Sequence, residues 1–375
     1  MNASIHRTQN PDANENRQLP PVFASAHPQT EVQQQLLQLA AGAVFSRAEW
    51  TALLRQRQPA DSEFLFPLSE ALRQAHYGIN VYIRGLIEFT NDCKGDCLYC
   101  GIRRSNHSAK RYRLTKQQIL DCCLAGYKLG FRTFVLQGGE NPAADESLTR
   151  LVLQIKQRFP DCALTLSAGE RPEAVYRRWF EAGADRYLLR HETADPDHYA
   201  MLHPPQQTWQ RRMACLHSLK DIGYQVGCGF MVGSPGQTDE HLAADLAFLQ
   251  EFRPHMVGIG PFIPHKDTPL RSYPAGTLEL TLFLLGTIRL LLPQVLLPAT
   301  TALGTIHPQG RELGIRAGAN VIMPNLSPAD VRGNYMLYDN KLHTGCEAAE
   351  HLNDLRRRLN AIGCDIAVCR GDSLM

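Results

Sequence analysis

Short segments rich in β-branched and aromatic residues alternate with longer amphipathic segments over most of this 375-residue chain. The amphipathic segments end in Gly-hydrophobic or Gly-Ala pairs that lead directly into the next short segment, as in LGFRTFV and AGANVIM. This pattern is typical of a helix that stops where a strand begins. Eight strands are expected, at 81–89, 133–139, 163–169, 186–192, 225–233, 256–264, 296–304 and 321–325. Eight βα units predict an α/β fold, a (β/α)8 TIM-type barrel with its functional groups at the C-terminal ends of the strands.

The barrel pattern is flanked on both sides by segments of another kind. Residues 1–34 are rich in Asn, Gln and Pro and nearly free of large apolar side chains, so we expect a disordered polar tail. Apolar residues at three- and four-residue intervals over 35–80 predict an N-terminal helical extension. The barrel is then expected over 81–330, and a C-terminal segment, 331–375, is expected to close it.

Charge and hydropathy argue against two classes of partner. The chain has 39 basic and 37 acidic residues, and a net charge of +2 offers no broad surface for nucleic acid or membrane. Its N-terminus lacks the apolar core of a signal peptide, and its richest apolar run, residues 282–293, is short and contains Arg289. We therefore expect a cytoplasmic protein with neither nucleic-acid nor membrane partners.

Three of the eleven cysteines, Cys93, Cys97 and Cys100, form the pattern C-x3-C-x2-C just after the first strand. Their loop would lie at the mouth of the barrel. A zinc site needs a fourth ligand, and His107 follows at no usual zinc spacing. A ferredoxin site needs a fourth cysteine, and the next one, Cys122, falls on a predicted helix. A 4Fe-4S cluster on three thiolates would leave one iron open to a substrate or cofactor.

An aromatic residue between the last two cysteines makes this loop resemble the signature of the radical S-adenosylmethionine (SAM) superfamily. The sequence Gly138-Gly139-Glu140, which ends the second strand, is similar to the superfamily's motif for the methionyl amine. The resemblance implies one 4Fe-4S cluster on the three cysteines, with SAM on the open iron. It also implies that the reduced cluster cleaves SAM to a 5'-deoxyadenosyl radical.

Longer stretches narrow the resemblance to one branch of that superfamily. IEFTNDCKGDCLYCGIRRSN, FVLQGGENP, AGADRYLLRHETADP, MVGIGPFIPHKDTPL and ANVIMPN closely resemble the HydE family of FeFe-hydrogenase maturases, over about residues 80–340. This implies an enzyme of H-cluster maturation that directs the radical at the sulfur of a small cysteine-derived iron carbonyl cyanide precursor of the diiron subcluster. Other hydrogenase maturases and a one-electron donor protein are the implied partners. A single cluster is expected, because only Cys346 lies where some relatives carry three further cysteines.

The resemblance divides the remaining mouth residues between two subsites. The expected cofactor-binding residues are Tyr99, Gly138, Gly139, Glu140, Ser167, Glu192, Arg212 and Met231. The expected substrate-binding residues are Gln137, Arg190, Thr300, Thr301, Met323 and Tyr338.

Several of these assignments have alternatives. The SAM carboxylate partner is Arg212 or its neighbour Arg211. Arg190 suits a bidentate pair with a substrate carboxylate, and the alternative is a purely structural pair with Glu192 or Asp195. Consecutive residues of a strand point to opposite faces, so only one of the two threonines at 300 and 301 should face inward unless a bulge intervenes.

Other functions remain open at this stage. Biotin synthase-like sulfur insertion needs cysteines inside the barrel, where Cys162 and Cys228 are candidates. A methylornithine synthase-like enzyme would use a similar polar mouth, and a non-catalytic iron-sulfur carrier would bind iron without cleaving SAM. The basic run Arg103-Arg104 and Lys110-Arg111 is typical of a solvated loop, and docking of an acidic electron donor is the alternative.

Overall fold

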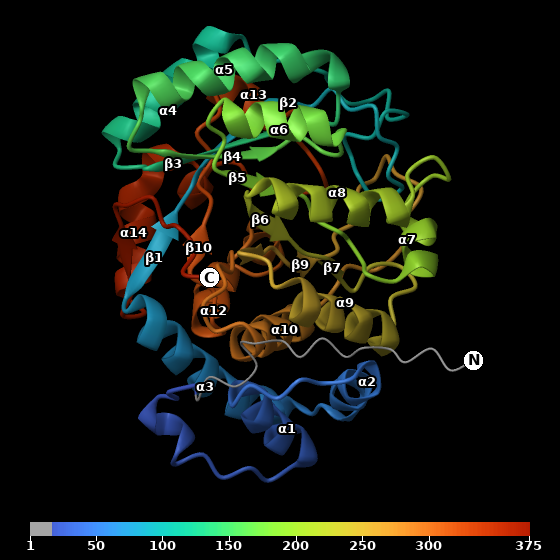
Figure 1. Ribbon diagram of the computed structural model, residues 1–375, viewed down its shortest axis with the longest axis vertical. Coiled ribbons are helices and arrows are strands. Elements are labelled where there is room, and N and C mark those ends of the chain that lie inside the picture. The colour runs from blue at the N-terminus through green and yellow to red at the C-terminus, as the bar shows by residue number, and fades with distance from the viewer. Residues whose placement is uncertain (1–16) are drawn as a thin grey trace, which may run out of the picture.

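The computed structural model describes residues 17–375, apart from the side chain of Cys346. At its centre a parallel sheet is surrounded by helices, with three N-terminal helices packed below it in Figure 1. The six-stranded sheet runs in the order β2 (Gly85–Thr90), β3 (Thr133–Gly138), β4 (Ala163–Ser167), β5 (Arg186–Leu188), β6 (Gln225–Cys228) and β8 (Met256–Val257). Every pair of neighbours in it is parallel, as βα units require.

The remaining strands extend this sheet into a partial TIM barrel. β1 (Asn80–Ile83) pairs in parallel with β10 (Val321–Ile322) and β11 (Asp365–Ala367), and β7 (Met231–Val232) pairs with β9 (Gly260–Pro261). Isolated parallel bridges, Met256 to Leu296 and Pro298 to Val321, connect β8 with β10. The alternating pattern thus predicted the class of fold, although the continuous sheet covers only part of the ring.

The predicted seventh strand, 296–304, is wrong as a strand. Only the single bridges at Leu296 and Pro298 occur there, and helix α11 (Thr301–Ile306) begins inside the predicted range. Pro298 has no N–H to donate to a ladder, which weakens any strand through this position. The predicted first, fifth and sixth strands are each split in two. Between β6 and β7, Gly229 adopts φ +145°, and a Cβ there would lie 2.0 Å from the carbonyl oxygen of Gly258.

Helices cover the outside of the sheet, and three of them begin at a threonine whose side chain caps the first turn. Thr115, Thr208 and Thr277 each accept a backbone N–H in this way. The covering helices are α4 (Lys116–Lys128), α5 (Asp145–Arg158), α6 (Glu173–Glu181), α7 (Pro196–Leu202), α8 (Trp209–Ile222), α9 (Asp239–Phe252), α10 (Leu278–Leu291), α11, α12 (Gly310–Arg316), α13 (Ala329–Arg332) and α14 (Leu352–Asn360). The apolar run noted in the sequence forms α10, which is buried along most of its length. Within residues 17–375, no helix has the length and apolar character needed to cross a bilayer.

The N-terminal helices form a layer against one side of the barrel. α1 (Glu31–Ala40) and α3 (Pro59–Tyr77) pack against α10, and α2 (Arg47–Gln56) packs against α9 (Figure 1). The prediction of a disordered tail up to residue 34 is wrong for residues 17–34. Arg17 donates to the carbonyl oxygen of Leu290 at 3.2 Å, and Thr30 caps α1. The part of that prediction concerning residues 1–16 lies outside the described residues.

The C-terminal part of the chain contacts both ends of the barrel. Near the cysteine loop, Gly101 N donates to Leu337 O at 2.8 Å, and Asp339 N donates to Pro264 O at 3.0 Å. At the opposite end, β11 extends the sheet through β1, and Arg186 pairs with Asp372 at 2.6 Å. Residues 334–341, which we call the mouth strap, therefore cross the C-terminal ends of the strands.

Candidate active site

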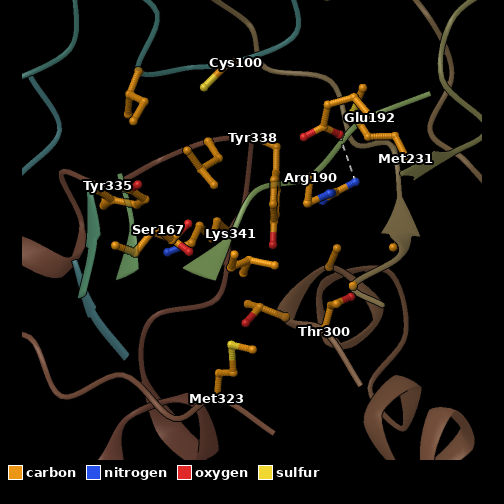
Figure 2. Close-up of a pocket in the computed structure, with 18 of the residues that line it drawn as sticks. Cys100, Ser167, Arg190, Glu192, Met231, Thr300, Met323, Tyr335, Tyr338 and Lys341 are labelled. Carbon is orange, nitrogen blue, oxygen red and sulfur yellow. Dashed lines mark ion pairs between the residues drawn. The ribbon is translucent and has the colours of Figure 1, made fainter. Parts of the chain in front are cut away.

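A cavity of about 360 Å³ opens at the C-terminal ends of the strands, beneath the mouth strap. Every site residue predicted from the sequence lines this cavity except Cys97. In Figure 2, Cys100 and Met323 lie at opposite ends of the labelled set, with Arg190, Tyr338 and Ser167 between them. The structure therefore brings together, in one chamber, residues that are spread from position 93 to position 338.

The cysteine loop is fixed by contacts to both of its flanks. Cys93 Sγ accepts a hydrogen bond from Glu140 N at 3.3 Å, and Cys97 Sγ accepts one from Gln207 Nε2 at 3.5 Å. All three motif cysteines are free and partly buried. Burial raises the pKa of each thiol, that of Cys97 to about 12, so these thiols are protonated unless a bound cation stabilises their thiolates.

Single-ion sites are absent from the described part of the chain. No three or more His, Cys, Asp or Glu side chains in it are grouped to hold one metal ion. In a 4Fe-4S cubane each cysteine binds a different iron atom, so its thiolates stand farther apart than the ligands of one ion.

Two glycines allow the end of β3 to pass directly beside the cysteine loop. A Cβ on Gly139 would lie 2.4 Å from Asp92 O and 2.9 Å from Cys93 Cβ. A Cβ on Gly138 would lie 2.6 Å from the ring of Phe89. Only glycine fits these positions without moving the loop, and the close approach places Glu140 beside the cysteines. Burial raises the pKa of the Glu140 carboxyl.

Of the two arginines considered for the SAM carboxylate, Arg212 lines the cavity and Arg211 does not. Arg212 is buried, and it donates from Nε to Glu170 Oε1 at 2.6 Å and from Nη1 to Arg190 O at 2.6 Å. Arg211 is exposed and pairs with the other oxygen of Glu170 at 3.2 Å. Sequence reasoning did not single out Glu170, which follows the end of the predicted third strand by one residue.

Arg190 and Glu192 form the ion pair drawn in Figure 2, with Nη2 and Oε2 3.1 Å apart. The same two atoms, together with Arg190 Nε and Thr300 Oγ1, are buried and make no hydrogen bond of suitable geometry to any residue that the structure describes. Glu192 also has φ +65°, an unusual value for a residue other than glycine. Unsatisfied polar atoms are costly inside a protein, so their concentration at this wall indicates a place for a polar ligand.

Both threonines at the seventh position of the ring line the cavity, and strand alternation does not apply to them because this segment is not a strand. The chain turns into α11 at this point, with Thr300 as its N-cap residue and Thr301 as its first residue. Thr301 Oγ1 donates to Glu347 Oε2 at 3.1 Å and accepts from Arg311 Nη2 at 3.2 Å. Thr300 is therefore the threonine whose hydroxyl is open to a ligand.

A buried ion pair in the cavity wall was missed by sequence reasoning. Lys341 Nζ lies 2.7 Å from Glu88 Oε1, and Asn325 Nδ2 donates to Glu88 Oε2 at 2.8 Å. Lys341 also lies over the ring of Tyr335, 5.5 Å from its centre. Glu88 had a usable signal, a single carboxylate within a buried strand, whereas Lys341 and Tyr335 had none.

The fold and this site define a class of enzyme. The family model described as the radical SAM superfamily matches residues 87–249, which span β2 to α9 and include all three cysteines. The chain is a radical SAM enzyme, and this superfamily implies a 4Fe-4S cluster and SAM.

Similarity to characterised proteins makes the assignment more specific. The chain is 48% identical to the FeFe hydrogenase maturase subunit HydE of Thermotoga maritima, over 75% of this chain and 80% of the relative. It therefore belongs to the HydE family. It is also 27% identical to the 3-methylornithine synthase of Methanosarcina acetivorans, over 84% of this chain and 89% of that one. The crystal structure of methylornithine synthase superposes with a TM-score of 0.79 at 25% identity, covering 90% of this chain and 97% of that chain.

Proposed function

We propose that this enzyme acts in the maturation of FeFe hydrogenase, on the sulfur of a small cysteine-derived iron carbonyl cyanide precursor of the diiron subcluster. One observation carries the proposal: a single cavity joins the three-cysteine loop to the Arg190–Glu192 ion pair and to Thr300, whose buried polar atoms make no well-formed hydrogen bond within residues 17–375. The 48% identity to HydE supports the choice of substrate class.

The cofactor subsite would lie between the cysteine loop and the ends of β3 to β5. Cys93, Cys97 and Cys100 would hold one 4Fe-4S cluster, since their loop supplies three thiols and the glycine pair leaves room beside them. When bound, the reduced cluster and SAM supply a 5'-deoxyadenosyl radical. Glu140 would face the methionyl amine, while Arg212, already neutralised in part by Glu170, would hold the SAM carboxylate.

The ribose end of SAM would extend along the same wall. Apart from its ion pair with Arg190, Glu192 Oε2 makes no hydrogen bond within residues 17–375, and it can accept from ribose hydroxyls. Tyr99, Met231 and Ser167 line the cavity around this position and would exclude water from the nucleoside.

The substrate subsite would lie deeper, towards Met323. Arg190 would turn from Glu192 to pair with the cysteine carboxylate, and the free hydroxyl of Thr300 would donate to it or to a cyanide nitrogen. Gln137, Thr301 and Tyr338 would add polar contacts, and the Met323 thioether would pack against the metal carbonyls. These side chains bind and orient the substrate, and none has to move a proton for an attack on sulfur.

Sulfur insertion of the biotin synthase kind has less support. Cys162 and Cys228 are buried, and neither lines the cavity. Within the described residues, the thiols that line it are those of Cys93 and Cys100. The cavity wall therefore has no further cysteine, within the described residues, that could hold a sulfur-donating cluster. A non-catalytic carrier would not need residues that match a SAM-binding subsite, so this alternative also has less support.

We also propose that the enzyme acts in the cytoplasm, with the other hydrogenase maturases and a one-electron donor as partners.

The test is anaerobic reconstitution with iron and sulfide, reduction, and addition of SAM with the iron-cysteine precursor. Products are followed by mass spectrometry and electron paramagnetic resonance. We expect an adduct between the adenosyl carbon and the substrate sulfur, lost in Cys97→Ala. Cleavage of SAM only with lysine would identify a methylornithine synthase-like enzyme. If the reduced protein binds SAM but does not cleave it in the presence of any candidate substrate, the result would favour a carrier.

A further inference from the structure

The loop that carries the cysteines has an unusual share of the chain's positive charge. Residues 91–113 contain six basic and two acidic residues, although the whole chain has a net charge of only +2. Both acidic residues already have partners: Asp92 pairs with Arg113 at 3.3 Å and Asp96 with Arg103 at 2.9 Å. The excess of positive charge therefore belongs to Lys94, Arg104, Lys110 and Arg111.

Three of these four cations face solvent without compensation. Lys94, Arg104 and Lys110 are exposed, and none of them has a carboxylate partner in the part of the chain that the structure describes. We call these three residues the basic surface. Arg104 N donates to Gly95 O at 2.8 Å, and Lys110 O accepts from Asn91 Nδ2 at 2.8 Å. These contacts hold the basic surface against the two sides of the cysteine loop.

The fourth cation makes this arrangement rigid. The Arg111 guanidinium donates to the carbonyl oxygens of Asn91 at 2.7 Å, Ile102 at 2.8 Å, Arg103 at 2.6 Å and Asn106 at 3.0 Å. It thus ties three segments of the loop together, and no carboxylate among residues 17–375 pairs with its charge. A fixed positive surface costs stability by self-repulsion, so its position on the loop that carries the cysteines points to a use.

We propose that the basic surface is the docking site of an acidic one-electron carrier protein. The inference rests on the proposed function, since reductive cleavage of SAM needs one electron for each turnover. The three cysteines are partly exposed at this loop, so a carrier seated on it is next to the cluster they would hold. One electron passes from the reduced carrier to the oxidised cluster, and no bond or proton is exchanged. Opposite charges on the two surfaces speed the encounter, and salt screens them.

The test uses the reconstituted full chain and an acidic flavodoxin as the probe. The variant Arg104→Glu/Lys110→Glu reverses two charges of the basic surface. The matched control, Lys128→Glu/Arg158→Glu, reverses two exposed charges in the last turns of α4 and α5, at the other end of the sheet. Two quantities are measured: the dissociation constant from flavin fluorescence, and the rate of cluster reduction by flavodoxin hydroquinone in a stopped-flow instrument.

For the basic-surface variant at low salt, we expect the dissociation constant to rise and the reduction rate to fall, each by about 10-fold or more. In 0.5 M salt, each should change by less than about 2-fold. The control variant should match the unmodified chain. Reduction by dithionite, a small reagent that needs no docking surface, should be the same in all three proteins.

Equal reduction rates by flavodoxin in the two double variants would overturn the proposal. So would a loss of heparin binding in the basic-surface variant without a change in reduction rate, which would assign the surface to a polyanion. Neither readout uses the iron-cysteine substrate. If the chain is reduced through this surface but forms no adduct between the adenosyl carbon and the substrate sulfur, the proposed function is refuted and the docking site is still supported.

Discussion

Arg190 and Glu192, two residues apart at the end of β5, neutralise each other across 3.1 Å in the cavity wall. We assign them to different ligands, the substrate carboxylate and the ribose of SAM. For Glu192→Gln, which keeps the shape and removes the charge, we expect the dissociation constant of SAM to rise about 10-fold, equivalent to about 1.4 kcal/mol. Equilibrium dialysis on the reconstituted protein measures it. Arg190→Lys should leave SAM binding within about 2-fold and weaken only substrate binding. Equal losses of SAM in both variants would show that the pair acts as one structural unit.

The cysteine assignment predicts a loss of iron rather than of folding. In Cys97→Ala, reconstituted iron should fall from about four atoms per chain to nearly none, since two thiolates do not retain a cubane. Iron and sulfide analysis and the visible absorption of the cluster measure this. Cys369→Ser is the control, because Cys369 is exposed and does not line the cavity. Full iron content in Cys97→Ala would remove Cys97 from the ligand set.

A single methyl group at Gly139 should disturb the cluster site. The added Cβ of Gly139→Ala meets Asp92 O at 2.4 Å, so the cysteine loop must shift. We expect less than half of the normal iron content. Gly333→Ala is the matched control, because Gly333 has an ordinary helical φ of −66° and its added Cβ meets nothing closer than 3.6 Å. Normal iron content in both variants would mean that the approach of β3 to the loop is not needed for cluster binding.

Breaking the buried pair of Glu88 and Lys341 should reduce stability. Lys341→Met leaves the Glu88 carboxylate with Asn325 as its remaining side-chain partner, and we expect a loss of about 3 kcal/mol in the free energy of unfolding. Urea unfolding measures it. The double variant Glu88→Gln/Lys341→Met should recover most of that loss, because no uncompensated charge remains. A double variant as unstable as the single one would show that packing of the Lys341 chain, rather than its charge, matters.

Stability should fall on mild acidification, in part through His203. Burial lowers the pKa of His203 from 6.5 to about 3. As the pH falls below 6.5 the unfolded chain therefore binds a proton that the folded chain does not, and stability present above this pH is lost progressively towards pH 3. Between pH 7 and pH 5 this histidine alone should account for about 2 kcal/mol. Other buried groups titrate as well, so the measured quantity is the difference in pH dependence between the unmodified chain and His203→Gln. Parallel curves would contradict the prediction.

Sequence patterns predicted the parts of the fold that depend on local periodicity. The strands from β2 to β6 and the helices between them follow from short segments rich in β-branched and aromatic residues, amphipathic segments and helix stops, and the polar residues at the strand ends do meet in one cavity. The pattern failed at 296–304, where buried apolar residues resemble a strand but Pro298 and the cap at Thr300 start a helix instead. It also failed at Arg17, which donates to the carbonyl oxygens of Leu290 and Leu291, more than 250 residues away.

The missed site residues have a common physical cause. Lys341 reaches Glu88 across 253 positions of sequence, and no local pattern marks a lysine that will be buried. Likewise, Glu170 lies in an irregular segment, and its role becomes visible only when Arg211 and Arg212 are seen on its two oxygens. The roles of such residues depend on contacts between distant parts of the chain. The cysteine motif and the glycine pair, in contrast, can be recognised from residues that are close together in the sequence.

The mouth strap has a consequence for how the protein is made. The cysteine loop and β3 leave the ribosome long before residues 334–341, which later supply Tyr335, Tyr338 and Lys341 to the cavity wall. During synthesis the thiols are therefore present while the chamber still lacks its cover. An iron-sulfur assembly protein can reach them most easily in that interval, before the contact between Gly101 and Leu337 forms.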